Sequence, residues 1–522
     1  MNREVAIQAI SDRSQVWDCL VIGGGATGLG AALEAASRGY QVLLVERHDF
    51  AKGTSSRSTK LVHGGVRYLE KGDIALVRGA LRERGLLLRN AAHLAHPLRF
   101  IIPAYHYWQL PFYGVGLKVY DALSGKLSLG KSRVLRREQV ASQLPNVETS
   151  GLKGGIVYFD GQFDDSRLAV SLLRTIQDLG GHAANYAEVV SLTKSNNKLS
   201  GATIRDIETG KEYPVRAKVI INATGIFTDA VRDLDDPQAI DIIAVAQGSH
   251  LVLPEKFLRS KSALMVPKTS DGRVLFAIPW HDRLVVGTTD FSVPKPVEEP
   301  QIQRQEVDFI LSEAGKYLAE DPTESDVLAC YSGLRPLVKH SGTKSTAALS
   351  RDHTVLISES GLVTITGGKW TTYRHMGEDC LNHSEEVAGF EHRLSKTAEL
   401  SLHGNSSAPE IFAPPEHLAV YGTDRKNIEE MAKTDVKAGD RLHPRLPYLV
   451  AEAKWAIDRE MARTIEDVLS RRTRALLLDS KAAVEVAPLV ARLLAEKLSR
   501  DATWEAEQVK QFSELAKHYT LN

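Results

Sequence analysis

The chain has 522 residues, which is too many for one hydrophobic core, so its length predicts two or three domains. Basic residues (Lys and Arg) and acidic residues (Asp and Glu) number 65 each. This balance gives no global attraction to nucleic acid, so an anionic ligand must be bound by a local cluster and we expect no nucleic-acid partner. The cysteines Cys19, Cys330 and Cys380 lie far apart without metal-ligand spacing, which predicts a reducing compartment, no disulfide scaffold and no metal site.

Residues 1–16 contain Glu4 and Asp12 and lack a long apolar core. We therefore expect an N-terminal lead that is either disordered or a short first helix, and neither a signal peptide nor a transit peptide. The stretch nearest to a membrane span, residues 98–123, is interrupted by charged residues and prolines. This pattern predicts no membrane-spanning helix, but it is compatible with a protein that lies on a membrane surface.

The first strong motif is a glycine fingerprint, DCLVIGGGATG, in which an apolar strand runs into the start of a helix over Asp18 to Gly28. Gly23 permits a tight turn, Gly25 lets the backbone approach phosphates, and Gly28 lets the helix pack against the strand. The N-terminus of that helix offers unpaired N–H groups and a positive dipole end. The motif predicts a cradle for the pyrophosphate of FAD or NAD.

The residues after the fingerprint support this interpretation. Residues 31–38 are good helix formers, Gly39 suits the helix end, and residues 41–45 form a second buried-strand run. Glu46 stands at the tip of that strand, 18 residues after Gly28. A carboxylate at this offset, close to the roughly 20 residues expected, accepts hydrogen bonds from the adenosine ribose and argues against NADP.

Four later segments have the composition of a cofactor site, and one of them, residues 217–225, would return the chain to the cofactor. The hydroxyl-rich loop 53–60 can wrap phosphates, and residues 61–68 place a His, a Gly pair and an Arg-Tyr pair close together. Residues 217–225 read as a strand ending in a small-residue turn. Residues 363–374 read as a strand, a Gly pair and a helix start, and oriented N–H groups there would stabilise a reduced flavin.

The last part of the chain has a helical pattern. The polar stretch 382–415 is the expected seam, and after it Thr464 and Asp467 form a capping pattern. Apolar residues then recur at helical spacing at Val490, Leu493, Leu494 and Leu498. We expect a separate helical domain at the C-terminus.

Taken in order, the motifs resemble one family. The fingerprint is followed by GTSSRSTKLVHGGVRYLE, YFDGQFDDSRL, INATG, GTTD, YSGLRPL and TGGKWTTYR. This set is similar to the aerobic-type, quinone-linked, FAD-dependent glycerol-3-phosphate dehydrogenases, and the resemblance extends from about Trp17 to the last helices.

The resemblance implies an α/β fold: a Rossmann-like FAD-binding domain, an interleaved antiparallel-sheet substrate domain and an all-α C-terminal domain. The expected bounds are 1–16 for the lead, 17–400 for the oxidoreductase region and 401–522 for the helical domain. Within the oxidoreductase region, the FAD-binding segments would be about 17–95, 150–245 and 335–385, and the substrate-domain segments about 96–149 and 246–334.

The implied activity is oxidation of sn-glycerol 3-phosphate to dihydroxyacetone phosphate, with hydride passing from C2 to flavin N5 and electrons going on to a membrane quinone. The resemblance also implies a homodimer in the cytoplasm, peripherally associated with the inner face of the cell membrane.

The resemblance also assigns the site residues. His63 and Arg335 would lie nearest the reacting carbon, and Arg67, Tyr68, His250 and Lys369 would surround the substrate. The FAD-binding residues would be Gly23, Gly25, Gly28 and Glu46 at the ADP half, Thr54 and Ser55 at the pyrophosphate, Val189 at the adenine, Ala223 and Gly225 in the returning turn, and Gly367, Gly368 and Thr371 at the flavin.

The chemistry constrains these roles. A phosphate dianion needs fixed cations, and an alcohol that loses hydride needs a general base within hydrogen-bond reach. His63 is the first choice for the base, because the unperturbed pKa of histidine is about 6.5. Arg335 would orient the hydroxyl, because a guanidinium is a poor base. Structural roles stay open for His63 beside the flavin, for His250 at a strand edge and for Tyr68 in the core.

A quinone acceptor requires a basic and apolar surface patch. The candidates are residues 105–113, residues 131–137, and the tail arginines Arg471, Arg472 and Arg474. Each is also compatible with an ordinary solvated face.

Three alternatives to the quinone-linked dehydrogenase are an oxidase, a flavin-bound scaffold or sensor, and an NAD-linked dehydrogenase. An oxidase of this family tends to carry an extra insertion, and none is obvious here. A flavin-bound scaffold or sensor has no need for three cations, Arg67, Arg335 and Lys369, over the ring. The GTSSRSTK and GGKWTTYR blocks have no role in a simple NAD-linked site.

Overall fold

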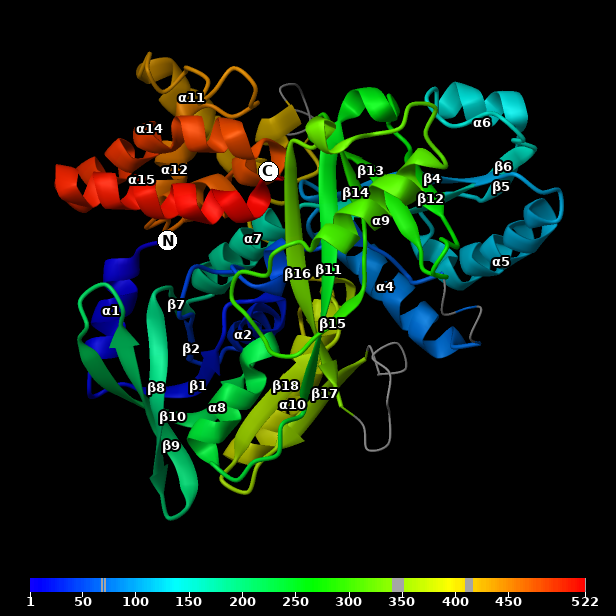
Figure 1. Ribbon diagram of the computed structural model, residues 1–522. Coiled ribbons are helices and arrows are strands. Elements are labelled where there is room, and N and C mark those ends of the chain that lie inside the picture. Colours follow the sequence, from blue (N-terminus) through cyan, green and yellow to red (C-terminus); the bar gives the residue numbers. More distant parts are fainter. Residues whose placement is uncertain (67–68, 70–71, 340–351, 409–415, 522) are drawn as a thin grey trace.

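The computed structural model describes residues 1–66, 69, 72–339, 352–408 and 416–521. Two large sheets and a group of C-terminal helices make up this part of the chain (Figure 1). Apolar residues are buried on both faces of each sheet, so both sheets are covered by helices or by other strands. The α/β fold predicted from the sequence, with a helical C-terminal part, is confirmed.

The first sheet is the predicted dinucleotide-binding sheet. Its central strands β1, β2 and β10 are parallel, and β18 runs parallel to β10. The β1 strand leads into α2, which packs against α10 and α7. The strand bounds in the order of pairing are β17 His353–Ile357, β18 Leu362–Gly367, β10 Glu212–Asn222, β1 Val16–Ile22, β2 Val42–Val45 and β7 His182–Ala184, with β9 Lys198–Asp206 on β10 and β8 Ala187–Ser195 on β9.

The second sheet is largely antiparallel. Its long strands β11 and β16 pair over ten residue positions and descend toward the first sheet (Figure 1). The strand bounds in the order of pairing are β15 Phe291–Val293, β11 Ile243–Pro254, β14 Arg283–Gly287, β13 Leu275–Trp280, β12 Ala263–Val266, β4 Ala95–Ala104, β6 Gly154–Phe163 and β3 Leu61–Val62, with β16 Ala329–Val338 on β11 and β5 Arg133–Arg136 on β6.

Helices cover the sheets and form the C-terminal part. In the sheet regions they are α1 Arg3–Ser11, α2 Ala26–Ser37, α4 Ile74–Asn90, α5 Gln109–Ser124, α6 Arg137–Gln143, α7 Asp165–Asp178, α8 Thr228–Asp235, α9 Arg304–Gly315 and α10 Tyr373–Ala388. In the C-terminal part they are α11 Arg425–Thr434, α12 Val450–Arg459, the π-helical turn η10 Asp467–Arg472, α13 Ala475–Leu478, α14 Ser480–Leu498 and α15 Ala502–Ala516.

The C-terminal helices share a core with the second sheet. Val252, Val285 and Ala329 of that sheet are buried against apolar side chains of α12, α13 and α14. The predicted capping pattern is present, because Thr464 Oγ1 accepts the Asp467 N–H at 3.2 Å and the Asp467 carboxylate accepts the Thr464 N–H at 3.0 Å. None of the helices in the described parts of the chain combines the length and the apolarity needed to cross a bilayer.

The structure tests one expectation about the N-terminal lead and one about the tail arginines. The lead forms the short helix α1, which Arg3 anchors by an ion pair to Asp206 at 2.5 Å. The prediction that Arg471, Arg472 and Arg474 form a membrane patch is wrong, because all three are at most 2 % exposed. Their charges are matched by carboxylates inside the protein rather than by a surface.

Candidate functional site

A cavity of about 1670 Å³ is lined by residues of both sheets. It is larger than the roughly 300–1,000 Å³ of an ordinary small-molecule site, so it has room for a dinucleotide and a substrate together. Among the described residues that the sequence predicted, those lining it are Gly23, Gly25, Glu46, Thr54, Ser55, His63, Val189, Ala223, Gly225, His250, Arg335, Gly367, Gly368, Lys369 and Thr371. Arg67 and Tyr68 lie outside the described residues.

The fingerprint glycines are required by close backbone approach. Gly23 has a φ of +106°, and a Cβ there would lie 2.6 Å from the Ala223 carbonyl oxygen. A Cβ on Gly28 would lie 1.9 Å from the Gly23 carbonyl oxygen. Gly28 therefore contributes to helix packing rather than to the cavity wall. Together these positions bring β1, β10 and the start of α2 to one edge of the cavity.

Glu46 and Val189 line the cavity from the first sheet. The Glu46 carboxylate accepts the backbone N–H of Gly24 at 2.7 Å and that of His48 at 2.8 Å. It therefore fixes the fingerprint turn as well as facing the cavity at the position expected for a ribose. Val189 lines the same cavity from β8, at the point where the pairing with β9 is interrupted by a register shift.

The hydroxyl-rich loop lies against the start of α2. Ser55 Oγ accepts the Ala26 N–H at 2.9 Å, and Thr54 Oγ1 donates to the Leu334 carbonyl at 2.5 Å. The Trp370 indole N–H donates to the Ser55 carbonyl at 2.8 Å. Hydroxyls and helix N–H groups thus meet in one place, which is the donor set that a pyrophosphate needs.

Arg335 lines the same cavity from β16. Its guanidinium donates to Asp290 at 3.2 Å and to Thr288 Oγ1 at 2.9 Å. Gly248 leaves the space for it, because a Cβ there would lie 2.1 Å from the guanidinium. Arg335 is therefore a cation held in one orientation at the cavity wall.

His250 faces the cavity from the middle of β11, so the strand-edge placement that the sequence left open is wrong. Its ring stacks on Tyr331 with centroids 4.7 Å apart, and Nε2 lies 3.0 Å from Thr59 Oγ1. Its Nδ1 has no hydrogen-bond partner among the described residues. Burial, followed by the charges of Lys60 and Arg335, holds the pKa of His250 well below its ordinary value, so the imidazole is neutral near pH 7.

His63 and Lys369 complete the described cavity wall on the side of the Gly pair. The backbone N–H of His63 donates to Thr371 Oγ1 at 3.2 Å, which brings the predicted base next to the second Gly-rich turn. Gly367 and Gly368 both have positive φ values, +79° and +73°. This turn places Lys369 at the cavity, just before the helical turn Trp370–Thr372.

Sequence reasoning did not assign three groups that support Arg335. Thr288 and Asp290 belong to the GTTD turn, a motif whose role the sequence does not indicate. Glu306, fully buried, accepts hydrogen bonds from Thr289 Oγ1 at 2.5 Å and Ser249 Oγ at 2.8 Å. It thereby fixes the turn. Its local signal in the sequence is one carboxylate in what the structure shows to be the first turn of α9, which alone indicates only a cap.

The comparisons with known proteins agree with this geometry. The fold and the cavity define an oxidoreductase that binds a flavin dinucleotide: the family described as FAD dependent oxidoreductase matches residues 18–374, and the C-terminal domain of alpha-glycerophosphate oxidase matches residues 395–507. The chain is 42% identical to the mitochondrial glycerol-3-phosphate dehydrogenase of Homo sapiens, over 98% of this chain and 74% of that one. Within this class, the chain belongs to the FAD-dependent glycerol-3-phosphate dehydrogenases.

Other relatives extend the match. A probable mitochondrial glycerol-3-phosphate dehydrogenase of Caenorhabditis elegans is 40% identical over 95% of this chain and 73% of that one. The solved structure of the glycerol-3-phosphate dehydrogenase of Bacillus halodurans, complexed with FAD, is 27% identical with a TM-score of 0.79, covering 99% of this chain and 97% of that one. The Mycoplasma pneumoniae L-alpha-glycerophosphate oxidase, 17% identical with a TM-score of 0.57, covers 72% of this chain and 96% of that one and shares the fold.

Proposed function

We propose that this enzyme oxidises sn-glycerol 3-phosphate beside Arg335 in the cavity and passes the electrons to a membrane quinone. The observation that carries the proposal is the position of Arg335, fixed by Asp290 and Thr288 in the same cavity as the glycine fingerprint. FAD, held by the glycine turns and by the loop with Thr54 and Ser55, supplies the acceptor for a hydride.

The cations of the cavity match the substrate. A phosphate dianion is bound best by fixed guanidinium and ammonium groups. Lys369 reaches the cavity from the turn after β18 and Arg335 from β16, and Arg67 is a third candidate from the sequence. We assign Lys369, His250, Arg67 and Tyr68 to substrate binding.

The hydroxyl proton needs an acceptor as the C2–H bond breaks. We assign this role to His63, which lines the cavity beside Thr371. Arg335 would orient the C2 oxygen and stabilise negative charge on it, because its guanidinium stays protonated. The hydroxyl O–H proton passes to His63, and the two electrons of the C2–H bond leave as hydride.

A surface around α5 supports membrane association. Exposed apolar side chains follow one another there with helical spacing, and Val134 of β5 lies beside Gly114 of that helix. We call the α5 surface the set Tyr107, Trp108, Phe112, Val115, Val119 and Val134. Exposed Lys118, Lys131 and Arg133 border it. Aromatic anchors with a basic rim suit a bilayer with anionic headgroups.

We therefore propose peripheral binding of this face to the inner surface of the cell membrane, where a lipid-soluble quinone is within reach. A cytoplasmic homodimer is proposed on the sequence resemblance alone.

The test is anaerobic reduction of the purified, yellow protein. Glycerol 3-phosphate should bleach the flavin absorbance, and a quinone analogue should restore it much faster than oxygen does. Bleaching by a different alcohol or an amine, but not by glycerol 3-phosphate, would remove the substrate assignment. Reoxidation by oxygen at the faster rate, with release of hydrogen peroxide, would favour the oxidase.

A further inference from the structure

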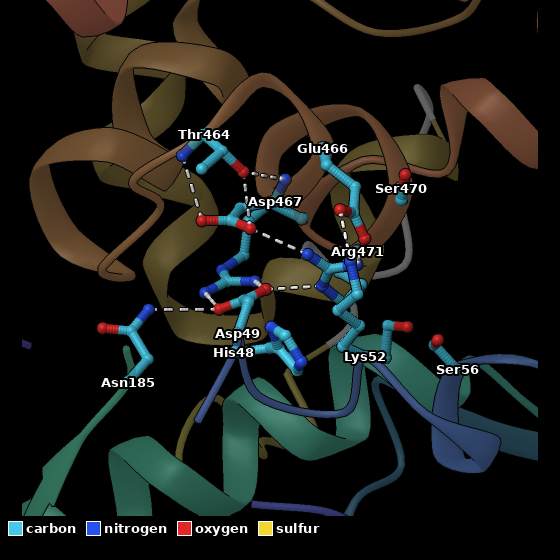
Figure 2. Close-up of polar contacts among 12 residues, drawn as sticks. His48, Asp49, Lys52, Ser56, Asn185, Thr464, Glu466, Asp467, Ser470 and Arg471 are labelled. Atoms are coloured by element: carbon cyan, nitrogen blue, oxygen red, sulfur yellow. Dashed lines mark hydrogen bonds and ion pairs between the residues drawn. The ribbon is translucent and has the colours of Figure 1, made fainter. Parts of the chain in front are cut away.

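A buried ionic cluster joins the C-terminal segment 464–474 to the loop 47–60 that carries Thr54 and Ser55 (Figure 2). The two segments are more than 400 residues apart in sequence. Four residues of the C-terminal segment contact the loop, and we call them the clamp: Glu466, Arg471, Arg472 and Arg474.

Asp49 is the centre of the cluster. Its carboxylate is fully buried and accepts the Arg471 Nε–H at 2.5 Å and two Arg472 N–H groups at 2.6 and 2.7 Å. Asn185 donates to it at 3.2 Å. Burial alone would raise the pKa of Asp49, but Arg472 and Arg471 hold it below its ordinary value.

A widened helical turn lets two adjacent arginines bind one carboxylate. In an α-helix, neighbouring side chains point in directions about 100° apart. Residues Asp467–Arg472 instead form a π-helical turn, with a hydrogen bond from the Thr473 N–H to the Val468 carbonyl at 2.8 Å. Such turns are rare and frequently lie at functional sites.

The other clamp residues contact the loop beyond Asp49. Lys52 donates to Glu466 at 2.7 Å, one residue before the predicted phosphate-binding Gly53-Thr54-Ser55. Arg474 donates to the Ser56 carbonyl at 2.9 Å, one residue after it. The clamp therefore holds the loop on both sides of the hydroxyls that face the cavity.

The energetics favour a single loop conformation. A buried charge that loses its partner costs several kcal/mol, so the loop cannot leave the clamp without exposing or orphaning Asp49. Phe50 and Ala51 anchor the start of the loop in the apolar core of the first sheet, but residues 52–60 are all polar or glycine. The geometry of the loop is thus set by the C-terminal segment as well as by the dinucleotide-binding sheet.

We infer that the clamp residues are positioning residues for FAD: they hold the Thr54–Ser55 loop in the conformation that binds the pyrophosphate. This inference rests on the proposed assignment of that loop to FAD. It gives the C-terminal helices a role in cofactor retention, so that loosening the clamp speeds FAD release before the protein unfolds.

The first test uses two matched half-buried ion pairs. Glu466 and Lys52 are 17% and 16% exposed, and Glu208 and Arg463, which join the same C-terminal segment to a different hairpin, are 17% and 14% exposed. The holoenzyme is diluted well below its melting temperature, and flavin fluorescence measures the release of FAD. Glu466→Gln should release FAD about tenfold faster than the wild type, because a charged hydrogen bond contributes about 1.5 kcal/mol. Glu208→Gln should stay near the wild-type rate.

The second test uses the buried arginines. Arg472→Met should release FAD faster still and should alter the visible circular dichroism of the bound flavin, and Arg472→Lys should lie between it and the wild type. The control is Arg38→Met, which breaks the equally buried ion pairs to Glu34 and Glu385 at a place away from the loop and the clamp. It should lower the melting temperature but leave FAD release unchanged.

Equal FAD release rates in Glu466→Gln and Glu208→Gln would overturn the inference, as would faster release that merely follows the loss of melting temperature in every variant. The proposed function would still stand if glycerol 3-phosphate bleached these variants normally. Ser55→Ala tests the loop assignment separately, because it should speed FAD release with the clamp intact.

Discussion

Arg335 is the residue on which the chemistry of the site most depends. Arg335→Ala should leave FAD bound, because its guanidinium donates to Asp290, Thr288 and the Thr289 carbonyl, which are not among the predicted FAD-binding residues. The rate of anaerobic flavin reduction by glycerol 3-phosphate should fall about 10²–10³-fold, the usual cost of removing a positioned donor to developing charge.

Stopped-flow bleaching measures this rate, and the flavin absorbance of the purified protein measures occupancy. Arg304→Ala is the control, because Arg304 is 68% exposed and pairs with Asp308 and Glu324 at the surface. A reduction rate within threefold of wild type in Arg335→Ala would place the reacting oxygen elsewhere.

Gly248 offers a way to move that guanidinium without removing it. A Cβ on Gly248 would lie 2.1 Å from Nη2 and 2.5 Å from Cζ of Arg335, so Gly248→Ala must displace the side chain from Thr288 and Asp290. Because a displacement of about 1 Å can cost about 10²-fold, kcat/KM should fall 10- to 100-fold with FAD content unchanged.

Gly116→Ala is the matched control, since nothing lies within 4 Å of that position in α5. Steady-state kinetics of the two variants side by side decide the matter. Wild-type kcat/KM in Gly248→Ala would mean that the guanidinium relaxes at no cost to the reaction.

At this scale the sequence predicts residues whose role is local. Gly23 and Gly28 could be predicted because the turn between a strand and a helix requires glycine there, whatever the distant parts of the chain do. Asp290 and Glu306 could not, because their partners come from strands about 45 to 57 residues away in sequence. Only the register of β11 with β16, which pairs Ala246 with Arg335, brings these groups together.

In the structure, two candidate membrane patches that are separate in the sequence meet at α5. Residues 105–113 and 131–137 meet because β5 lies beside this helix, and Lys118 donates to the Ser132 carbonyl. Trp108 and Phe112 remain 58% and 56% exposed. Exposed aromatic rings with a basic border support the proposed membrane contact of this face.

Trp108→Ser combined with Phe112→Ser should weaken binding to vesicles that contain phosphatidylglycerol about 10- to 100-fold, because half-burying each ring in lipid contributes about 1 kcal/mol or more. Vesicle sedimentation measures it, with Leu394→Ser as the control at a site 80% exposed elsewhere. Unchanged binding of the double variant would exclude the α5 surface as the anchor.

The tail arginines show the limit of prediction at the element scale. A run of Arg471, Arg472 and Arg474 is usually a solvated face, and nothing local indicates that its partners are carboxylates such as Asp49 and Asp165 from the first third of the chain. Elements with a regular apolar period, such as β1, β2, β10 and α14, were predictable because burial alone specifies them. Charge runs become interpretable only when the fold supplies the partner.

For the whole molecule, the junction between the C-terminal helices and the first sheet is built from buried acids. Burial alone would raise the pKa values of Asp49, Glu460 and Glu466, but their arginine and lysine partners hold all three below the ordinary values. Depressed pKa values mean that this stabilisation is present above the unfolded-state pKa, about 3.9 for Asp and 4.3 for Glu, and is lost as the pH falls below it.

Two other buried acids, Glu452 and Asp467, have raised pKa values, so the folding stability that they contribute changes with pH in the opposite direction. Burial raises the pKa of Glu452 to about 8, and burial together with Asp49 raises that of Asp467. Between about pH 8 and pH 4.3, Glu452 therefore stabilises the fold as the pH falls. Below about pH 4, Glu452 is protonated in both the folded and the unfolded state, so it no longer changes the folding stability with pH. The stabilisation lost when the acids with depressed pKa values become protonated then dominates.

The melting temperature of the holoenzyme should therefore fall steeply between pH 4 and pH 2.5 after a gentle maximum near pH 4.5 to 5. Circular dichroism in the far ultraviolet follows the fold, and circular dichroism in the visible follows bound flavin. Asp49→Asn should make the fall of the melting temperature between pH 4 and pH 2.5, the acid limb, less steep, because one acid with a depressed pKa is gone. Glu452→Gln should reduce the change of the melting temperature with pH above pH 5 without changing the acid limb. An acid limb of wild-type slope in Asp49→Asn would show that acid unfolding starts away from this junction.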